Sequence, residues 1–369
     1  MIARCCLVLA VCVVFSASAQ DAADQIKRWL QMDKDGDLKL TKDESTGLMK
    51  RFFDQNDANK DGFLDHKELE ALQQRLSRNR GRQQPNNNRN RQQATSTEQL
   101  LKTAPDDVII EPDIAYRPGD SKAWRLDLVR AKKDSETPRA GIVFVHGGGW
   151  RSGDKRTGTF LRGAIEYAQK GYVCITVNYR LTGEAPFPAC IEDVKCAVRW
   201  FRANAKKYNL DSDRLGAYGN SAGAHLVSML GLCRADAGLE GDGPHQDQSS
   251  LVQAVCASAT PSKLDLFGRS PKSSERFKGD NEEERIKLIR KSSPVNHVSN
   301  GAPPFLLIHG NADRTVDVKH GDILVEALKK AGADVTYLRI EGAGHGVFNQ
   351  HKDRTGPAME NFFARTLGE

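Results

Sequence analysis

The chain has no long hydrophobic run after its first twenty residues. No later stretch reaches the ~18 consecutive apolar residues that a membrane-spanning helix needs. The formal net charge is only +6, and much of the excess lies in one arginine-rich stretch, residues 78–97, with no nucleic-acid-binding motif beside it. We therefore expect neither a membrane span nor a nucleic-acid partner.

Cysteine is also scarce, with eight residues in the chain. Three of them precede residue 20, and none of the others has the C-x-x-C spacing of a metal site. Cys174 lies in an apolar run and is expected to be a buried thiol. Export would permit up to two disulfides among the remaining four, whose pairing the sequence leaves open: Cys190, Cys196, Cys233 and Cys256. No catalytic cysteine is expected.

Residues 1–19 have the three parts of a secretory signal peptide. Arg4 supplies the positive charge, an apolar stretch follows it, and Ala17-Ser18-Ala19 offers a small-residue cleavage site. The sequence therefore predicts a protein that is exported, to the periplasm or out of the cell, and soluble after cleavage.

Residues 20–77 are expected to form a small all-α domain with two calcium loops. The second loop, residues 57–68, fits an EF-hand at every key position, with Gly62 at the sharp turn. Its spacing wraps several hard oxygen atoms around one point, as Ca²⁺ requires. The predicted ligands of this loop are Asp57, Asn59, Asp61, the backbone carbonyl of Phe63, and Glu68.

The first loop, residues 33–44, departs from the pattern at its sharp turn. Leu38 replaces the glycine there, so a side chain must tolerate an unfavourable backbone conformation. Binding at this loop is therefore left open. Its predicted ligands are Asp33, Asp35, Asp37, Lys39 at position 7, and Glu44. The two loops together resemble the compact EF-hand pairs attached to secreted bacterial proteins.

Residues 78–97 are polar and contain no aromatic or acidic residue, which predicts a disordered linker. Contact between its arginines and a polyanion, such as an acidic polysaccharide, is the alternative. From residue 98 to residue 369 the pattern changes to that of a catalytic domain.

In this domain, apolar strand-like runs alternate with helical stretches, which predicts a mostly parallel sheet with helices on both faces. The first two strands have no helix between them and would form an antiparallel edge. Strands are predicted at 108–116, 124–129, 141–145, 172–177, 215–218, 252–257, 304–308 and 335–340. Helices are predicted at 160–170, 191–208, 222–233, 322–331 and 358–367.

The residues G-N-S-A-G at 219–223 match the G-x-S-x-G pattern of a nucleophile elbow. A predicted buried strand precedes them and a predicted buried helix follows, which is the context that this motif requires. The turn is so tight that the neighbours of the serine must be small, which explains Gly219 and Gly223. Ser221 is therefore the predicted nucleophile.

Three other predicted strands end in residues that would complete this site. One is followed by His146-Gly147-Gly148-Gly149, where glycines leave backbone N–H groups free to face an oxyanion, although these residues could also be a flexible turn. The others are followed by Asp313, which can orient an imidazole, and by His345, which can reach the serine. The order Ser221, Asp313, His345 is that of the α/β-hydrolase triad.

From about residue 113 onwards the chain resembles the α/β-hydrolase esterases of the feruloyl and acetylxylan esterase group. This resemblance implies an α/β-hydrolase fold with Ser221 as nucleophile, His345 as base and Asp313 as the acid that orients it. The matching runs are VFVHGGGWRSGDKR, VNYRLTGEAPFPACIEDVKCAVRWFRANA, LGAYGNSAGAHL, PPFLLIHGNADRTV and EGAGHGVF.

The resemblance also assigns the oxyanion hole to the backbone amides of Ala222 and of Gly147 or Gly148, and it implies no cofactor for catalysis. One departure concerns the elbow, where GNSAGAH replaces the commoner GGSAGGH and also resembles kynurenine formamidases. The fold and the triad are unaffected, but the substrate is left open.

Several nearby residues are not expected to take part in the chemistry. His225, one turn after Ser221, is expected to pack inside its helix, and Asp265 to be structural or at the surface. Asp317 is an alternative to Asp313 as the acid. Trp150 is expected to pack beside the glycine loop, with a substrate contact as the alternative. Residues 262–298 are expected to be a partly helical insertion over the site.

We therefore expect an exported serine carboxylesterase of acetyl or feruloyl esters on polysaccharide, with calcium bound by the EF-hand pair. One alternative is a short-acyl esterase, a lipase or an arylformamidase. An alternative of another class is a calcium-dependent binding scaffold with an inactive hydrolase fold.

Overall fold

The computed structural model describes residues 29–45, 50, 53–72, 101, 103–157, 159–267 and 275–368. The predicted signal peptide and linker lie outside the described residues, as do parts of the predicted calcium-loop domain. Contacts within the chain divide it into two units, Met1–Gln92 and Gln93–Glu369.

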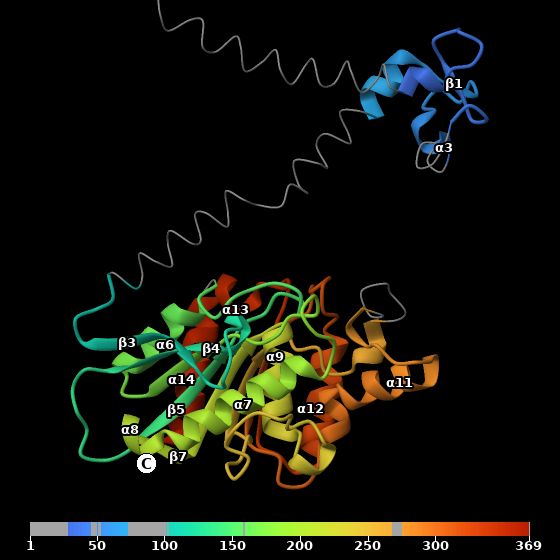
Figure 1. The fold of residues 1–369 in the computed structure, drawn as a ribbon. Helices are drawn as coiled ribbons and strands as arrows, with labels where there is room; N and C mark the ends of the chain where they lie inside the picture. The colour runs from blue at the N-terminus through green and yellow to red at the C-terminus, as the bar shows by residue number, and fades with distance from the viewer. Residues whose placement is uncertain are drawn as a thin grey trace, which may run out of the picture. The chain divides into compact units, whose positions relative to one another are not determined.

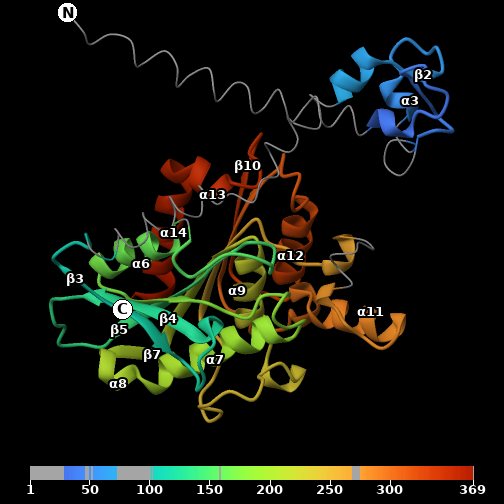
Figure 2. The ribbon, with the colours of Figure 1, turned by 45° about the horizontal axis from the view of Figure 1, so that its top comes forward.

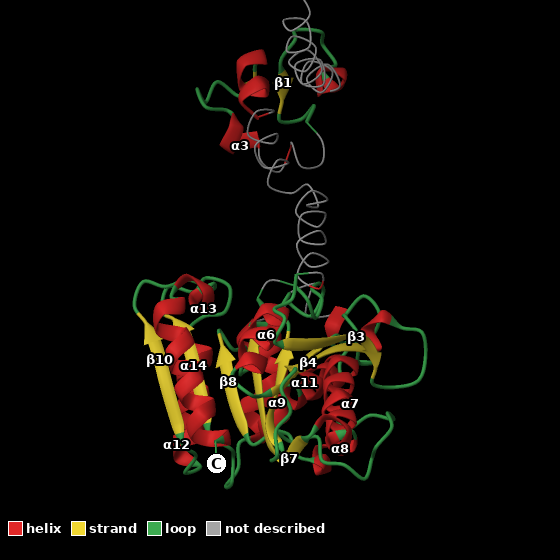
Figure 3. Cartoon of the chain, turned by 90° about the vertical axis from the view of Figure 1, so that its left-hand side faces the viewer, coloured by secondary structure: helices red, strands yellow, loops and turns green. Residues whose placement is uncertain are grey.

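The larger unit is built on one eight-stranded sheet. Its strands are β3 (Val108–Ala115), β4 (Arg125–Ala131), β5 (Arg139–Val145), β6 (Val173–Val177), β7 (Leu210–Asn220), β8 (Ala254–Ser258), β9 (Phe305–Gly310) and β10 (Val335–Ile340). Their spatial order is β10-β9-β8-β7-β5-β6-β4-β3, so that β10 and β3 are the two edges (Figure 3).

Neighbouring strands from β10 to β6 are parallel, whereas β4 runs antiparallel to both β6 and β3. The predicted mostly parallel sheet with an antiparallel pair at its edge is confirmed. The strand β7 begins at Leu210, five residues before the predicted start. The sequence pattern missed this part because residues 211–214 are polar.

Helices cover both faces of the sheet (Figure 1). They are α6 (Phe160–Gln169), α7 (Ala189–Ala203), α8 (Ala205–Tyr208), α9 (Ala222–Leu232), α11 (Glu282–Lys291), α12 (Lys319–Lys330), α13 (Val347–Gln350) and α14 (Lys352–Leu367). Short 3-10 helices connect them at η2 (Lys122–Trp124), η3 (Ala235–Ala237), η4 (Leu264–Phe267) and η5 (Pro294–His297).

Several helix boundaries differ from those predicted, and α12 begins at Lys319 rather than at residue 322. The stretch predicted as one helix over 191–208 is divided into α7 and α8 at Asn204. The helix α14 begins at Lys352 rather than at residue 358 and includes Pro357, although a proline inside a helix removes a backbone hydrogen bond.

Alternation along β5 places side chains in two separate hydrophobic cores. Val143 and Val145 belong to the core under α7, α9 and α12, whereas Ile142 and Phe144 belong to the core under α6 and α14. The helices α6 and α14 lie side by side in both ribbon views (Figures 1 and 2). The strands β5, β6, β8 and β9 are apolar on both sides and almost entirely buried, so the centre of the sheet is covered on both faces. Functional loops are therefore expected at the carboxyl ends of the strands.

The smaller unit contains η1 (Leu30–Met32), β1 (Leu40–Thr41), α3 (Phe53–Asn56) and β2 (Phe63–Leu64), and residues 66–72 are helical. The strands β1 and β2 pair antiparallel, with Leu40 opposite Leu64. The core of this unit consists of Leu40, Phe53, Leu64, Leu69 and Leu72. This strand pairing connects the two predicted calcium loops, because β1 lies in the first loop and β2 in the second.

The described residues contain no helix that is both long and apolar enough to cross a membrane. The five cysteines after residue 20 are all buried and free. The disulfides that the sequence left open therefore do not form among the described residues.

Candidate active site

Ser221 lies in the sharp turn between β7 and α9, with φ 55° and ψ −121°. A β-carbon added to Gly219 would lie 2.3 Å from the backbone carbon of Gly223, and one added to Gly223 would lie 2.0 Å from the carbonyl oxygen of Val145. Both glycines are therefore required by close backbone contacts. The strained serine is held by its N–H, which donates to the Ser258 carbonyl at 2.9 Å.

Ser221, His345 and Asp313 form one hydrogen-bonded chain of side chains. His345 Nε2 lies 2.9 Å from Ser221 Oγ, and His345 Nδ1 lies 2.7 Å from Asp313 Oδ2. The three residues follow β7, β10 and β9, whose carboxyl ends lie at the same edge of the sheet. A nucleophile, a base and an orienting acid thus lie within hydrogen-bonding reach of one another.

The loops that carry Asp313 and His345 are bonded to each other. The N–H of Ala312 donates to the carbonyl of Ala343 at 3.0 Å, and the N–H of Gly342 donates to the side-chain oxygen of Asn311 at 2.7 Å. These bonds fix the separation of the acid and the histidine independently of their own contact.

The carboxylate of Asp313 is fully buried and stays ionised. Burial alone would raise its pKa, but hydrogen bonds outweigh burial and hold the pKa well below the usual range. They come from the ring of His345 and from the N–H groups of Val316 and Thr315, and the ring of His309 lies nearby. The closer ring is that of His345, because His309 Nε2 lies 3.6 Å from Asp313 Oδ2 and only 3.0 Å from the Val316 carbonyl.

The oxyanion loop, defined here as residues 146–151, lies directly against the nucleophile. A β-carbon added to Gly147 would lie 2.7 Å from the Asn220 carbonyl oxygen and 3.4 Å from Ser221 Cβ. Gly148, Gly149 and Trp150 all have positive φ, at 115°, 62° and 59°. Only a glycine-rich chain can approach the serine this closely with this backbone.

His146 orients the amide groups of this loop. Its Nδ1 lies 2.8 Å from the Gly147 carbonyl, which can only accept, so the ring donates from Nδ1. In a trans peptide the Gly148 N–H points away from that carbonyl and remains available to a ligand. Tyr179 stacks on the His146 ring at 4.4 Å and donates its hydroxyl to the His146 carbonyl at 2.9 Å.

Burial lowers the pKa of His146 to about 4, so its ring is neutral at neutral pH. The stacking and the hydrogen bond with Tyr179 thus hold the oxyanion loop in place. These contacts favour an ordered oxyanion loop over the alternative of a flexible turn.

Ala222, the third predicted oxyanion residue, opens the helix α9. Backbone N–H groups in the first turn of a helix have no carbonyl partner within the helix, and the helix dipole makes this end positive. The predicted donors at Ala222, Gly147 and Gly148 therefore lie on two segments that flank Ser221.

The family comparison agrees with this geometry. Residues 126–328, more than half of the chain, match the BD-FAE family. The chain belongs to the BD-FAE family. Among curated proteins, it is 32% identical to Esterase LipC of Mycobacterium tuberculosis over 248 residues, which is 65% of this chain and 60% of LipC. Esterase LipQ of the same organism is 30% identical over 242 residues, 63% of this chain and 56% of LipQ.

Solved structures give the same class. A truncated carbohydrate esterase from gut microbiota superposes with a TM-score of 0.64 at 25% identity, covering 72% of this chain and 99% of that one. An esterase of Thermogutta terrifontis, Est2, superposes with a TM-score of 0.58 at 25% identity, covering 72% and 96%. The α/β-hydrolase architecture is confirmed, and the relatives and neighbours named here are esterases. The chain spans about 60% of the length of the curated relatives named above.

The other residues considered from the sequence lie away from the reacting atoms of this BD-FAE member. His225 is fully buried in α9, where Nδ1 accepts from Trp150 Nε1 at 3.2 Å and Nε2 lies 2.6 Å from the Ser292 carbonyl. Burial lowers its pKa to about 3, so it is a packed, neutral ring as predicted. Asp317 and Asp265 are exposed, and Asp317 accepts from the N–H of Lys319.

Sequence reasoning missed a charged network behind the oxyanion loop. Asp127 is fully buried in β4 and accepts from Arg156 Nη2 at 2.8 Å, while Lys155 Nζ lies 2.6 Å from Asp113 Oδ1. The backbone N–H of Lys155 also donates to Asn178 Oδ1 at 2.5 Å. This network ties the segment after the loop to the sheet edge. The one available signal was an acidic residue, Asp127, inside an apolar strand.

The insertion at residues 262–298 contacts the oxyanion loop where the structure describes it. Glu275 Oε2 lies 2.5 Å from Arg151 Nη1, and the guanidinium of Arg276 stacks on the buried ring of Trp150. Trp150 therefore packs beside the glycine loop, as expected.

The carboxylates of the first calcium loop converge. One oxygen from each of Asp33, Asp35 and Asp37 lies within 4.8 Å of the others. The bond from the N–H of Gly36, with a weaker one from the N–H of Leu38, lowers the pKa of Asp33. Leu38 takes the left-handed conformation of the missing glycine, with φ 63°, and points its side chain into solvent.

The second loop has the same internal bonding. The N–H of Gly62, at φ 88°, donates to Asp57 Oδ2 at 3.0 Å, just as the N–H of Leu38 donates to Asp33. Glu68 Oε1 accepts from the N–H of Ala58 at 2.7 Å, and Glu44 accepts correspondingly from Lys34 at 3.0 Å. The two predicted loops therefore share the same pattern of internal hydrogen bonds.

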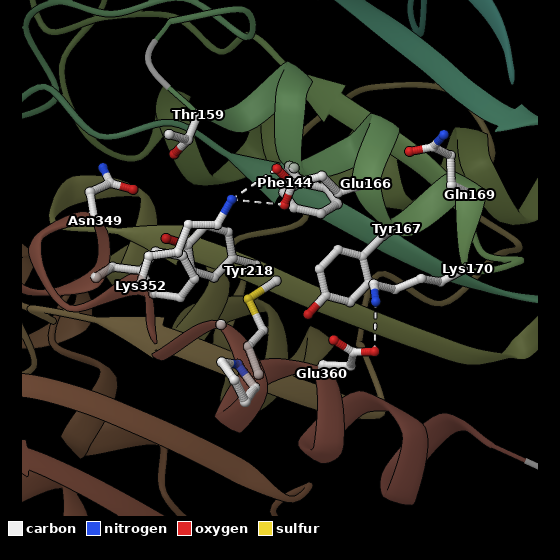
Figure 4. A pocket seen from close by; sticks show the side chains of 15 residues that line it. Phe144, Thr159, Glu166, Tyr167, Gln169, Lys170, Tyr218, Asn349, Lys352 and Glu360 are labelled. Carbon is white, nitrogen blue, oxygen red and sulfur yellow. Dashed lines mark hydrogen bonds and ion pairs between the residues drawn. The ribbon is translucent and has the colours of Figure 1, made fainter. Parts of the chain in front are cut away.

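A cavity of about 470 Å³ lies between α6 and α14, and none of the three triad residues lines it. Its floor is aromatic, with Phe144 and Tyr218 from the sheet (Figure 4). Two ion pairs cross it from helix to helix, Lys352 with Glu166 and Lys170 with Glu360. The helix α13, which follows His345, forms part of its wall.

Proposed function

We propose that the protein is an exported serine carboxylesterase that hydrolyses acetyl or feruloyl esters on polysaccharide through Ser221, His345 and Asp313. The observation that carries the proposal is the hydrogen-bonded chain of these three side chains beside a glycine loop with free N–H groups. No other feature of the described residues brings a nucleophile, a base and oxyanion donors together.

The first half of the reaction forms an acyl-enzyme. His345 Nε2 takes the Ser221 Oγ proton while Oγ attacks the ester carbonyl carbon. The N–H groups of Ala222 and of Gly147 or Gly148 stabilise the oxyanion, each contributing about 3 kcal/mol. Asp313 stabilises the imidazolium of His345, which then returns the proton to the departing alcohol oxygen as the ester C–O bond breaks.

The second half repeats these steps with water. His345 accepts a proton from water, the hydroxide attacks the acyl carbon, and the same N–H groups hold the second oxyanion. The carboxylic acid leaves as Ser221 Oγ regains its proton from His345. These steps use only groups of this chain.

The polysaccharide substrate is supported by the structural neighbours. One is described as a carbohydrate esterase from gut microbiota, and another as a bifunctional GH43-CE from Bacteroides eggerthii, with 28% identity, a TM-score of 0.63 and 70% of this chain covered.

The test measures acetate and ferulate release from acetylated and feruloylated xylan, with Ser221→Ala as control and p-nitrophenyl acetate beside it. We expect one of the two acids to be released by the wild type and neither by the variant. Cleavage of p-nitrophenyl acetate alone would remove the polysaccharide assignment and leave the esterase.

A second candidate is a general short-acyl esterase, because Est2 of Thermogutta terrifontis also has structures with propionate and with butyrate bound. The same experiment separates the two candidates. A chain-length series of p-nitrophenyl esters that peaks at three or four carbons, with no release from xylan, favours this candidate.

Calcium binding by the N-terminal unit is the remaining part of the proposal. The donor set fits Ca²⁺, because the first loop brings carboxylate oxygens of Asp33, Asp35 and Asp37 to one point, and both loops have the sharp turn in place. The ion would be held by Asp33, Asp35, Asp37, Lys39 and Glu44 in the first loop and by Asp57, Asn59, Asp61, Phe63 and Glu68 in the second. Bound there, it would stabilise this unit and would take no part in ester hydrolysis.

Export rests on the predicted signal peptide at residues 1–19. The mass of the protein recovered from the periplasm or medium tests it. We expect an N-terminus at Gln20, and a full-length cytoplasmic protein would contradict export.

A further inference from the structure

We propose that Arg276 is a positioning residue for the oxyanion loop. This proposal rests on the serine-esterase function proposed above and concerns the same site. Arg276 does not touch the substrate in this account. It acts through Trp150, the residue that follows the three glycines of the loop.

The guanidinium of Arg276 lies close to two aromatic rings. Its Cζ is 3.2 Å from the centroid of the Trp150 ring and 4.7 Å from that of Phe277. Arg276 is only 6% exposed, and a cation stacked on an aromatic face gains most where water is excluded.

This stacking is the main interaction that the guanidinium makes. Among the described residues, Arg276 Nε and Nη2 are buried without a hydrogen-bond partner. Burial lowers the pKa of Arg276 to about 9, and the opposing contributions come from Cys190 and Tyr179 rather than from a carboxylate. A buried cation with so few polar partners is costly, so its position is explained by the ring that it covers.

Trp150 is the point at which the loop needs support. It is the last of three consecutive residues at positive φ, a conformation that persists only where the surroundings impose it. Three contacts hold it. Its Nε1 donates to His225 at 3.2 Å, its carbonyl accepts from the N–H of Thr182 at 2.8 Å, and its ring face is covered by Arg276.

Arg276 is itself anchored to the body of the hydrolase unit. Its carbonyl accepts from the N–H of Phe187 at 2.9 Å, and the ring of Phe277 packs on that of Phe187 with centroids 5.7 Å apart. The preceding residue, Glu275, pairs with Arg151. Two adjacent residues of the insertion thus hold two adjacent residues of the oxyanion loop.

The expected consequence of losing the guanidinium is a misplaced loop. The N–H groups beside Ser221 stabilise the oxyanion only when aimed at the position that it will occupy. The ground-state ester places no negative charge there. A shift of the loop therefore lowers kcat and leaves KM nearly unchanged.

The test compares Arg276→Met with Arg276→Lys, using p-nitrophenyl acetate. Methionine keeps an apolar stem without the cation, whereas lysine restores a cation over the ring. We expect Arg276→Met to lower kcat by ~10- to 100-fold, less than loss of a whole oxyanion donor, with KM within about 3-fold. Arg276→Lys should recover most of that loss. A trifluoromethyl ketone, which forms a tetrahedral oxyanion with Ser221, should bind Arg276→Met more weakly by the same factor.

The matched control is Arg202→Met in α7. Arg202 is also a buried arginine, but it donates to the carbonyls of Ser212, Ser249 and Leu251, away from the oxyanion loop. We expect it to lower the melting temperature without lowering kcat. Equal loss of kcat in both variants, or an Arg276→Met enzyme with the wild-type kcat, would overturn the proposal, as would failure of lysine to do better than methionine.

Two further measurements keep the outcome decisive. If Arg276→Met does not fold, Glu275→Gln weakens the same attachment from an exposed position, and it should lower kcat by ~2- to 5-fold at unchanged KM, as expected of a solvent-exposed pair. An unchanged kcat there contradicts the proposal. If the wild type hydrolyses no ester, the proposed function fails, and the contact between Arg276 and Trp150 is measured by tryptophan fluorescence instead. Arg276→Met must then change the emission of the otherwise wild-type protein, but it must not change the emission of a protein that already carries Trp150→Phe.

Discussion

Asp313 in the hydrolase unit and Glu68 in the N-terminal unit are carboxylates held in similar ways. Each accepts hydrogen bonds from backbone N–H groups of its own loop, Asp313 from Thr315 and Val316 and Glu68 from Ala58. They differ in what completes their surroundings. Asp313 also accepts from the His345 side chain, so the chain itself supplies its partner.

In the predicted calcium loops, by contrast, the carboxylates of Asp33, Asp35 and Asp37 lie close to one another, and Asp61 accepts from the side-chain amide of Asn59 at 3.0 Å. The triad side chains therefore complete one another's hydrogen bonding, whereas the first loop gathers negative charge that a bound cation would balance. The difference teaches that the two units should respond to different changes. Hydrolysis should depend on hydrogen bonds within the chain, and the stability of the N-terminal unit on a metal.

The largest effect on catalysis should come from weakening the hydrogen bond between Asp313 and His345. Asp313→Asn keeps the shape of the side chain but removes the charge that orients and stabilises His345. We expect kcat to fall by ~10⁴-fold, as for removal of the acid from other triads. Steady-state kinetics with p-nitrophenyl acetate measures it. Asp317→Asn is the matched control, and a comparable loss there would mean that the wrong carboxylate has been assigned.

A smaller effect should follow from removing the last ligand of the second calcium loop. Calcium at about 100 times its Kd should stabilise the N-terminal unit by about 2.7 kcal/mol. Glu68→Gln should abolish this stabilisation by calcium. The kcat for ester hydrolysis should stay within about twofold of wild type, well below the tenfold change that a 1.4 kcal/mol rise in the activation barrier would cause. Thermal unfolding with calcium or a chelator measures the first effect. A chelator that stops turnover while both units remain folded would contradict the separation of the two regions.

The smallest effect concerns the sharp turns of the two loops. Leu38 occupies a left-handed conformation that costs a side chain about 1 kcal/mol, and its side chain is 66% exposed, so little packing is lost on removal. Leu38→Gly should therefore tighten calcium binding at the first loop by roughly fivefold, which is that free energy expressed as a ratio. Calorimetric titration measures it. Gly62→Leu is the reciprocal control, and weaker binding by Leu38→Gly would show that the leucine does not limit the site.

The sheet and the triad residues could be predicted from the sequence because each is signalled locally. Ser221, Asp313 and His345 each follow an apolar strand, and parallel strands bring their carboxyl ends together. Distinguishing His345 from His225 also needed only local context, because His225 lies within an apolar helix.

What could not be predicted depends on pairs that are distant in sequence. Nothing near Arg276 indicates that it covers Trp150, and Arg156 reaches Asp127 only after the sheet has formed. The start of α14 was missed for another reason, because packing of the helix overrides the local cost of Pro357.

The central claim is that Ser221 is activated within this chain, and covalent labelling tests it most directly. The folded wild type is treated with a fluorophosphonate, and the modified peptide is identified by mass spectrometry. We predict one adduct, on Ser221, that forms in the presence of a chelator and is absent from Ser221→Ala. A folded protein that takes up no label, or that is labelled on another serine, would contradict the account.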